Sequence, residues 1–380
     1  FSSFEVHSDE TQDEFNGGLV GSLGYDFIRY TENLPDDNED EIALLEREIN
    51  HNIQKRQKEL ELTIALTNYC NFSCVYCYQN KNEKLMTTEV ANMIIEKIDR
   101  ILNDNIFEGI NIHYFGGEPL LNIPVLIYLD ENIKKITDKI GIVYKAFLTT
   151  NGSMLSKELL QKVKFSSIKL TFDGLEKTHD RLRVSDHFHF KEEIELIENI
   201  MNFSQAKVLL RTNICKENKD EIIALHKYIF EKFGNERIEI NPNRTIKYHQ
   251  DDSFEMLSVQ EYAEVAYQIK LLWSEQKGKF ELPVPRSTPC KFPYGNAYAI
   301  SPEGYCTFCS GSMDQEKKYF FDVDIENKKM FSVRKECKKC NILPLCLGGC
   351  IIQYNLRAGA CTYEKYELKN ILISYIKHIS

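Results

Sequence analysis

Six short runs rich in β-branched and aromatic residues alternate with six longer amphipathic stretches between residues 62 and 276. Strands that alternate with helices in this way lie parallel and are joined by right-handed crossovers. The pattern predicts an α/β fold, a partial (β/α)6 TIM-like barrel rather than a closed eight-stranded one. The expected strands are 62–66, 110–115, 144–149, 168–172, 208–213 and 237–240, and the expected helices are 88–103, 122–138, 155–163, 189–203, 217–233 and 258–276.

Unusual residues follow these strands. A cysteine-rich loop comes after the first strand, and the second ends in Phe115-Gly-Gly-Glu-Pro119. The third and fourth end in Thr149-Thr-Asn-Gly152 and Thr171-Phe-Asp-Gly174, and the fifth carries Arg211-Thr-Asn213. The C-terminal ends of parallel strands meet at one rim, where such folds place their active sites. The sequence therefore predicts a single site at this rim.

The cysteine-rich loop holds Cys70, Cys74 and Cys77 with the spacing C-x3-C-x2-C. Four thiolates would close a [4Fe–4S] cluster, whereas three leave one iron without a protein ligand and open to a small molecule. The alternative is a zinc ion with water as its fourth ligand. A non-catalytic scaffold with structural zinc would be colourless and would not cleave any cofactor.

The loop and the strand-end motifs resemble the signature of the radical S-adenosylmethionine (SAM) enzymes. The resemblance implies that Cys70, Cys74 and Cys77 hold the catalytic cluster and that the amino and carboxylate groups of SAM chelate its open iron. An electron from the cluster then cleaves SAM to a 5′-deoxyadenosyl radical. Tyr76 and Tyr78 flank Cys77 where the family sets an aromatic residue and a backbone group against the adenine.

The same resemblance assigns the remaining SAM contacts. The Gly-Gly-Glu motif binds the cationic amino group, and three polar residues lie near the ribose and the methionyl moiety. Arg183 and Arg211 are both candidates for pairing with the SAM carboxylate through a planar guanidinium fork, and the sequence does not choose between them. The implied cofactor-binding residues besides these arginines are Gly116, Gly117, Glu118, Asn151, Thr171 and Asp173.

The C-terminal third carries a second cysteine pattern, which resembles the SPASM domain of radical SAM enzymes that modify peptides and proteins. The resemblance implies two auxiliary [4Fe–4S] clusters, and hence three clusters in all. The distal cluster would be bound by Cys337, Cys340, Cys346 and Cys361, and the nearer one by Cys290, Cys309 and Cys350. Cys306 is either the fourth ligand of the nearer cluster or not a ligand, which would leave an iron open to a substrate thiolate.

One further cysteine, Cys215, belongs to neither pattern. On an alternating strand it shares a face with Arg211 and Asn213, so it would point toward the barrel mouth. A lone cysteine is commonly a small buried hydrophobe. The alternative is a hydrogen-atom donor, as in radical SAM peptide epimerases.

Composition limits the partners and the compartment. Of 380 residues, 43% are hydrophobic and 27% charged, and no run of about 18 apolar residues suggests a membrane span. The net charge of −10 argues against nucleic acid as a partner. Twelve cysteines bunched in short motifs indicate metal binding in a reducing cytoplasm.

We expect three regions: an acidic segment over 1–60, a radical SAM barrel over 61–280 and a SPASM domain over 281–380. Residues 1 to 50 hold 14 acidic side chains against Arg29 and Arg47, which is either a solvated surface or a docking face for a basic leader peptide. The acidic stretch 36–41 before a helical 44–57, and the Tyr-Phe-Gly-Gly-Glu-Pro motif, resemble peptide maturases.

These features favour an enzyme that abstracts hydrogen from a ribosomally made precursor peptide and forms a cysteine thioether. The alternatives are a formylglycine-forming sulfatase maturase, a peptide epimerase and an enzyme that makes a carbon–carbon cross-link. The expected partners are a precursor peptide with a leader and a flavodoxin or ferredoxin as electron donor.

Overall fold

A computed structural model describes the chain over residues 39–104, 107–234, 237–247, 254–278, 283–307, 309–311, 318–323, 330–350 and 361–379. Most of the acidic N-terminal segment, residues 1–38, lies outside the described residues, so its predicted docking role is not addressed. All twelve cysteines lie within them. Among the described residues, no helix combines the length and the apolar character that crossing a bilayer requires.

The α/β fold with a parallel sheet is confirmed. Its six main strands pair side by side in parallel, in the order β6-β5-β4-β3-β2-β1. Their outward residues, such as Ile112, Ile168 and Leu210, form the main hydrophobic core with the helices. The strands are β1 (Glu59–Ala65), β2 (Gly109–Phe115), β3 (Val143–Thr149), β4 (Phe165–Thr171), β5 (Lys207–Ile214) and β6 (Ile238–Arg244).

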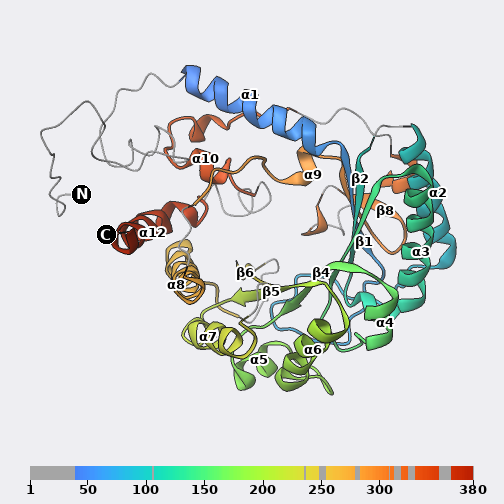
Figure 1. Cartoon of the computed structure of the whole chain (residues 1–380), viewed down its shortest axis with the longest axis horizontal. Coiled ribbons are helices and arrows are strands. Elements are labelled where there is room, and N and C mark those ends of the chain that lie inside the picture. The colour runs from blue at the N-terminus through green and yellow to red at the C-terminus, as the bar shows by residue number, and fades with distance from the viewer. Residues whose placement is uncertain are drawn as a thin grey trace, which may run out of the picture.

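Helices line the outer side of this sheet, as Figure 1 shows. The helices expected from the sequence are present, and Glu176–Leu182 adds a short helix that the sequence pattern did not predict, because seven residues hold barely two helical turns. The helices are α2 (Thr88–Asp104), α3 (Ile123–Ile140), α4 (Lys157–Lys162), α5 (Glu176–Leu182), α6 (Phe190–Phe203), α7 (Ile222–Phe233) and α8 (Val259–Lys277), with the 3₁₀ turn η2 (Pro119–Asn122).

The sheet continues beyond β1, which the sequence did not predict. Strand β7 (Ala297–Ile300) pairs in parallel with β1, and β8 (Tyr305–Thr307) and β9 (Lys318–Tyr319) follow in antiparallel pairing. The described sheet thus has nine strands, with β6 and β9 at its two ends. Strands of two to four residues are too short to leave a readable alternation, which explains why they were missed.

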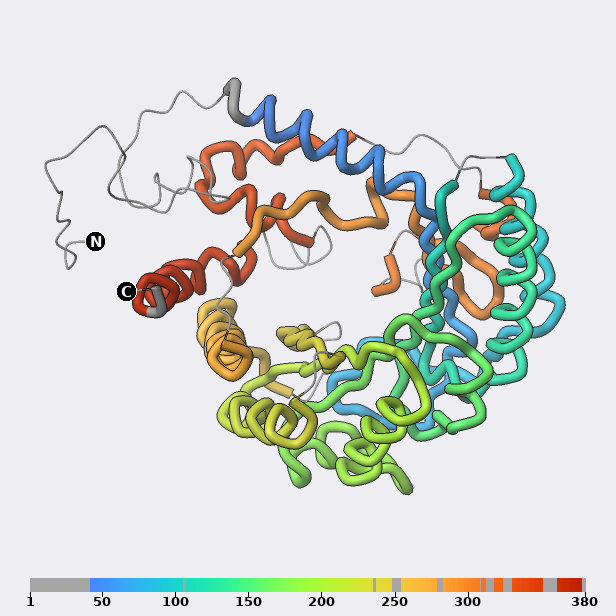
Figure 2. The backbone as a smooth tube through the Cα atoms, in the orientation of Figure 1, coloured from blue at the N-terminus to red at the C-terminus, as the bar shows by residue number. Residues whose placement is uncertain are grey.

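The C-terminal segment returns across the molecule and contacts both ends of the earlier chain. Helix α12 (Glu364–Ile379) packs against α8, where Lys270 pairs with the buried Glu367. Helix α1 (Glu39–Arg56) lies beside residues 331–333, as Figure 2 shows, and Asn50 exchanges two hydrogen bonds of 2.7 and 3.0 Å with the backbone of Phe331. Short elements complete this segment: α9 (Lys291–Tyr294), η4 (Phe320–Asp322), η5 (Lys335–Cys337) and α10 (Leu343–Cys346).

Candidate functional site

The cysteine loop after β1 is held by backbone hydrogen bonds to the end of α5 and to the residues that follow it. Ser73 N donates to Val184 O at 2.8 Å, and Val75 N donates to Leu182 O at 3.0 Å. A turn closes the loop, with Cys77 N donating to Cys74 O at 3.1 Å. Cys70, Cys74 and Cys77 are all half-buried on this one loop at the rim, and burial, together with the nearby thiols of Cys77 and Cys70, raises the pKa of Cys74.

The pair Gly116 and Gly117 lets β2 approach this loop closely. Gly117 N donates to Thr67 O at 2.8 Å, and Glu118 N donates to Tyr69 O at 2.8 Å. A Cβ on Gly117 would stand 2.1 Å from Tyr69 O, which no side chain can occupy. Gly116 has a φ of 146°, a conformation that residues with a side chain avoid. The motif is therefore the backbone surface against which the cysteine loop is set.

Glu118 lies beneath this surface and not on it. Its side chain is 0% exposed, and its oxygens accept hydrogen bonds from Thr150 Oγ1 at 2.6 Å, Asn151 N at 2.6 Å and Leu120 N at 3.0 Å. Burial raises the pKa of Glu118 to about 6. This placement disfavours the expected contact between the carboxylate and the amino group of SAM, and makes Glu118 the link between the ends of β2 and β3.

Asn151 connects the end of β3 to the cysteine loop. Its Nδ2 donates to Asn71 Oδ1 at 2.8 Å and lies 3.9 Å from Cys70 Sγ. Its Oδ1 accepts hydrogen bonds from the backbone and hydroxyl of Ser153. Asn151 is thus at the site, as predicted, next to the thiols.

Asp173 follows β4 and is completely buried at the same rim. Its Oδ1 accepts a 2.7 Å hydrogen bond from Asn213 N, and its Oδ2 accepts one from the hydroxyl of Tyr76. Thr171, two residues earlier, is buried as well, whereas Tyr78 is half-buried. The carboxylate therefore ties the cysteine loop to β5 through Tyr76.

The structure distinguishes the two arginine candidates. Arg183 is 6% exposed, and its buried Nε has no hydrogen-bond partner among the described residues. Burial lowers the pKa of Arg183, but the nearby Tyr76, Cys74 and other acidic groups outweigh this effect and raise it. Arg211 points instead to the inner face of the sheet, with Nε donating to Asn213 Oδ1 at 2.8 Å. Arg183 is the arginine beside the cysteine loop.

Asn218 was missed in the sequence, although it organises the rim. Its Nδ2 donates to the carbonyl oxygens of Asp173 at 2.7 Å and Asn213 at 2.8 Å, while its Oδ1 accepts from Cys215 N at 2.9 Å. No motif surrounds it, and a single asparagine near a helix start carries no signal of its own. Its importance arises only when β4 and β5 lie side by side.

Cys215 is completely buried in a small cluster with Leu182 and Phe254, against Val75 and Tyr76 of the cysteine loop. Burial raises the pKa of its thiol. This environment favours the packing interpretation of Cys215 over the hydrogen-donor alternative.

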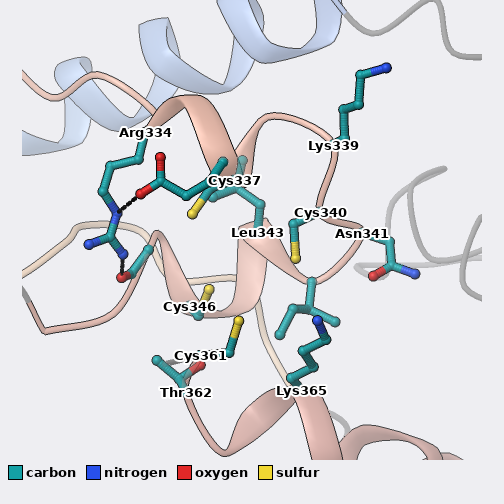
Figure 3. Close-up of a pocket in the computed structure, with 13 residues that line it drawn as sticks. Arg334, Cys337, Lys339, Cys340, Asn341, Leu343, Cys346, Cys361, Thr362 and Lys365 are labelled. Carbon is teal, nitrogen blue, oxygen red and sulfur yellow. Dashed lines mark hydrogen bonds and ion pairs between the residues drawn. The ribbon is translucent and has the colours of Figure 1, made fainter. Parts of the chain in front are cut away.

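A second group of cysteines surrounds a cavity of about 360 Å³ in the C-terminal region. Figure 3 shows the sulfur atoms of Cys337, Cys340, Cys346 and Cys361 pointing into this space from three segments of the chain. Burial, together with the nearby thiols of Cys340 and Cys337, raises the pKa of Cys346 to about 11. The four residues predicted to bind the distal cluster are therefore brought together.

The predicted ligands of the nearer cluster are only partly assembled by described contacts. Burial raises the pKa of Cys290, and so does the thiol of Cys350, which lies close to it. The Sγ of Cys309 accepts a hydrogen bond from Gly311 N at 3.3 Å. Cys306 lies elsewhere: it pairs with Ile300 across the β7–β8 ladder, and both pack in the main core. This position disfavours Cys306 as a cluster ligand.

The rim fits an iron–sulfur cluster with SAM in its donor chemistry. Three thiols on one loop lie beside a glycine surface that admits no Cβ and beside a buried arginine with an unpaired Nε. Burial raises the pKa of Cys74 to about 11, so a bound cation is needed to keep the thiolate form. Across the described residues, no three His, Cys, Asp or Glu side chains gather closely enough for a single metal ion.

A protein-family model matches the part of the chain that forms this rim. Residues 64–229 match the model of the Radical SAM superfamily. This segment is a radical SAM domain. It begins within β1 and ends within α7, so it contains every rim residue described above. The C-terminal cysteine sites lie outside it. The family implies SAM and one [4Fe–4S] cluster.

Sequence similarity to one curated protein extends beyond this domain. The radical SAM cyclopropyl synthase TigE of Paramaledivibacter caminithermalis is 24% identical over 372 residues, which cover 86% of this chain and 76% of TigE. Other relatives are matched over shorter stretches, and the chain covers 39% of one and 53% of another.

Solved structures share the fold of most of the chain. Native anSMEcpe with bound AdoMet and Kp18Cys peptide superposes with a TM-score of 0.65 at 19% identity, covering 84% of this chain and 98% of that one. SuiB of Streptococcus suis, bound to its precursor peptide SuiA, gives a TM-score of 0.57 at 16% identity, covering 89% and 84%. At these identities the likeness shows the fold.

Proposed function

We propose that this chain is a radical SAM peptide maturase that installs an oxidative cross-link, a cysteine thioether, in a ribosomally made precursor peptide. The observation that carries the proposal is the rim constellation of three thiols, a glycine surface and the buried Arg183 in a radical SAM domain that is followed by a second set of cysteines. The fold neighbours that hold peptides, anSMEcpe and SuiB, support a peptide as substrate.

The residues of the rim divide the work. Cys70, Cys74 and Cys77 hold the cluster, the Gly116–Gly117 backbone faces the amino group of SAM, and Arg183 pairs with its carboxylate. When bound, the cluster and SAM supply the 5′-deoxyadenosyl radical. The buried carboxylates of Glu118 and Asp173 fix the loops that carry these groups, and their packing keeps water from the site.

The C-terminal cysteines would bind the auxiliary clusters that accept the electron from the substrate. Thioether formation breaks a C–H bond and an S–H bond of the peptide and forms a C–S bond, so one hydrogen atom, one proton and one electron must leave the substrate. We assign Cys337, Cys340, Cys346 and Cys361 to one auxiliary cluster and Cys290, Cys309 and Cys350 to another, in a SPASM domain over 281–380. A flavodoxin or ferredoxin would supply the electron that starts each cycle.

A second candidate function is carbon–carbon bond formation on a peptide. The match that favours it is TigE, a cyclopropyl synthase whose similarity spans 86% of this chain. The two functions predict the same loss of two hydrogen atoms but differ in their use of a cysteine. A product whose cysteine no longer reacts with iodoacetamide is a thioether, whereas a product with an alkylated cysteine is a carbon–carbon product.

The first experiment measures iron, acid-labile sulfide and zinc per chain after anaerobic purification and reconstitution, together with 5′-deoxyadenosine formed from SAM and dithionite. Three clusters predict about twelve iron with matching sulfide. A triple Cys70, Cys74 and Cys77→Ala variant is expected to lose about four iron and all 5′-deoxyadenosine. Zinc in place of iron, or 5′-deoxyadenosine from the triple variant, would refute the proposal.

A further inference from the structure

The inner face of the sheet, opposite the helices, carries two cationic side chains in its middle. Ile168 and Leu170 pack into the helix-covered core, so Lys169 between them faces inward. Arg211 on the neighbouring strand follows Leu210, which lies in the same core, and therefore faces inward as well. In the β4–β5 ladder Lys169 pairs with Leu209 and Thr171 pairs with Arg211, which makes the two cations diagonal neighbours.

A third cation reaches this face from α9. The Nζ of Lys291 lies 2.6 Å from Glu61 Oε2 on β1 and 3.5 Å from His113 Nε2 on β2. The other oxygen of Glu61 accepts a 3.1 Å hydrogen bond from Arg56 Nε. Burial lowers the pKa of His113 to about 3, so its ring is neutral. Glu61 thus already serves two cations.

Two of these cations have no described carboxylate partner. Glu61 pairs with Lys291 and Arg56, and Glu239, which lies beside Leu209 on the neighbouring strand β6, pairs with Lys207 instead. No described carboxylate pairs with Lys169 or Arg211. Burial, with the nearby Arg211 and Lys291, lowers the pKa of Lys169 to about 8. An anion bound here would give Lys169 and Arg211 a partner and would favour the protonated lysine.

This anion is not the SAM carboxylate. Arg183 lies beside Cys74 and Asp173 at the rim, where the SAM-binding loop ends. Lys169 lies four residues before Asp173 on the same face of β4, which is about 13 Å along a strand. Arg211 lies two residues before Asn213, or about 7 Å. Lys169 and Arg211 therefore lie on the inner face of the sheet, one to two layers of side chains below the rim.

We propose that Lys169 and Arg211 form a binding subsite for a carboxylate of the peptide substrate. The proposal rests on the proposed function and deepens it by assigning a substrate class, a peptide with an aspartate or glutamate side chain or a C-terminal carboxylate close to the modified residue. Held about 7 to 13 Å from the rim, this carboxylate fixes which residue of the peptide meets the radical. Lys291 contributes charge, while its Glu61 partner keeps it in place.

The test uses the reconstituted holoenzyme with SAM and three mixtures of N-acetylated octapeptides, separated into bound and unbound fractions and identified by mass spectrometry. One mixture carries a glutamate and a C-terminal amide, the second a glutamine and an amide, and the third a glutamine and a free C-terminal carboxylate. Wild type is expected to retain the first or the third about tenfold over the second, because a charge-assisted pair is lost with the carboxylate. Which of the two is retained identifies the source of the carboxylate.

Variants separate the subsite from other effects. Lys169→Gln and Arg211→Gln should abolish the preference, and Lys169→Arg should keep most of it. Lys207→Gln is the matched control, since Lys207 lies on the same strand as Arg211, exposed and paired with Glu239 at 2.5 Å, and it should leave both preference and SAM cleavage unchanged. Thermal unfolding confirms that each variant is folded.

Two results would overturn the subsite: equal retention of all three mixtures by wild type, or an unchanged preference in both Lys169→Gln and Arg211→Gln. Inorganic phosphate is added as a competitor, and binding of phosphate with no retained peptide would also overturn it. Failure of the wild type to form 5′-deoxyadenosine when dithionite is added to the same samples would count against the proposed function instead.

Discussion

The two best-assembled cysteine sites of this protein are built differently. At the rim, Cys70, Cys74 and Cys77 lie on a loop whose backbone is bonded to α5 and its C-terminal extension and to β2, and whose neighbours are buried polar side chains with internal partners. In the C-terminal region, four thiols line a cavity of about 360 Å³ formed mainly by short turns and loops. Arg334, bonded to Gly348 O, joins two of these turns.

The difference predicts that the two sites depend to different degrees on their bound groups for stability. The rim is positioned by the sheet, so its geometry does not depend on the group it holds. The C-terminal site surrounds a hollow, and its single turns are closed by local backbone hydrogen bonds rather than by a sheet, so much of its stability would come from what binds there, as in small structural metal sites. Four variants test this contrast.

The largest expected effect is on catalysis, at the rim. Replacing Cys70, Cys74 and Cys77 by Ala is expected to lower the rate of 5′-deoxyadenosine formation at least about a thousandfold, since no residue can substitute for the lost ligands. The unfolding temperature should change little, because the loop is held by backbone bonds. Calorimetry on wild type and variant checks this, and a large loss of stability would show that the rim also depends on its cluster.

A smaller loss is expected from Gly117→Ala. The added Cβ would stand 2.1 Å from Tyr69 O, so the cysteine loop must shift, and a displacement of about 1 Å costs about a hundredfold in rate. The matched control is Gly141→Ala, at a φ of 83° with no atom within 4 Å of the new Cβ, which costs only about 1 kcal/mol of backbone strain. Equal rates in the two variants would mean that the close approach does not matter.

The sequence predicted much of this architecture because the responsible signals are local. Each of the six main strands lies within a few residues of its expected range, since a run rich in β-branched and aromatic residues is visible over about five positions. The cysteine patterns are equally local. The α/β fold and the placement of the motifs at one rim followed from these two signals.

The parts that were missed depend on contacts between distant residues. Glu118 was expected to face SAM, but its partners Thr150 and Asn151 lie more than 30 residues away, and only the folded sheet shows that they enclose it. The extension of the sheet by β7 depends on pairing between Glu61 and Ala297, which no local pattern encodes. The burial of Cys306 follows from that same extension.

At the C-terminal site the main effect should be on stability and iron content. Cys337→Ala with Cys340→Ala is expected to remove about four iron and to speed amide exchange in α10 and α12 at least about tenfold, while uncoupled SAM cleavage at the rim persists. Cys306→Ala is the control: it should keep all the iron and cost about 1 kcal/mol as a core truncation. Loss of iron from Cys306→Ala would show that Cys306 is a cluster ligand.

The smallest expected effect is a pH dependence of the free energy of unfolding, which arises at the rim from Glu118. Burial raises the pKa of Glu118 to about 6, so the folded state binds this proton more tightly than the unfolded chain, whose carboxyl has an ordinary pKa near 4.5. The linked stability is present below pH 4.5 and is lost as the pH rises through about 6, a change of at most about 2 kcal/mol. In Glu118→Gln this contribution is absent, so the difference in free energy of unfolding between wild type and variant should shift against wild type from pH 4.5 to 7. A constant difference would mean that the donors from Thr150, Asn151 and Leu120 already compensate for burial, and that the rim is satisfied with an ionised carboxylate at its base.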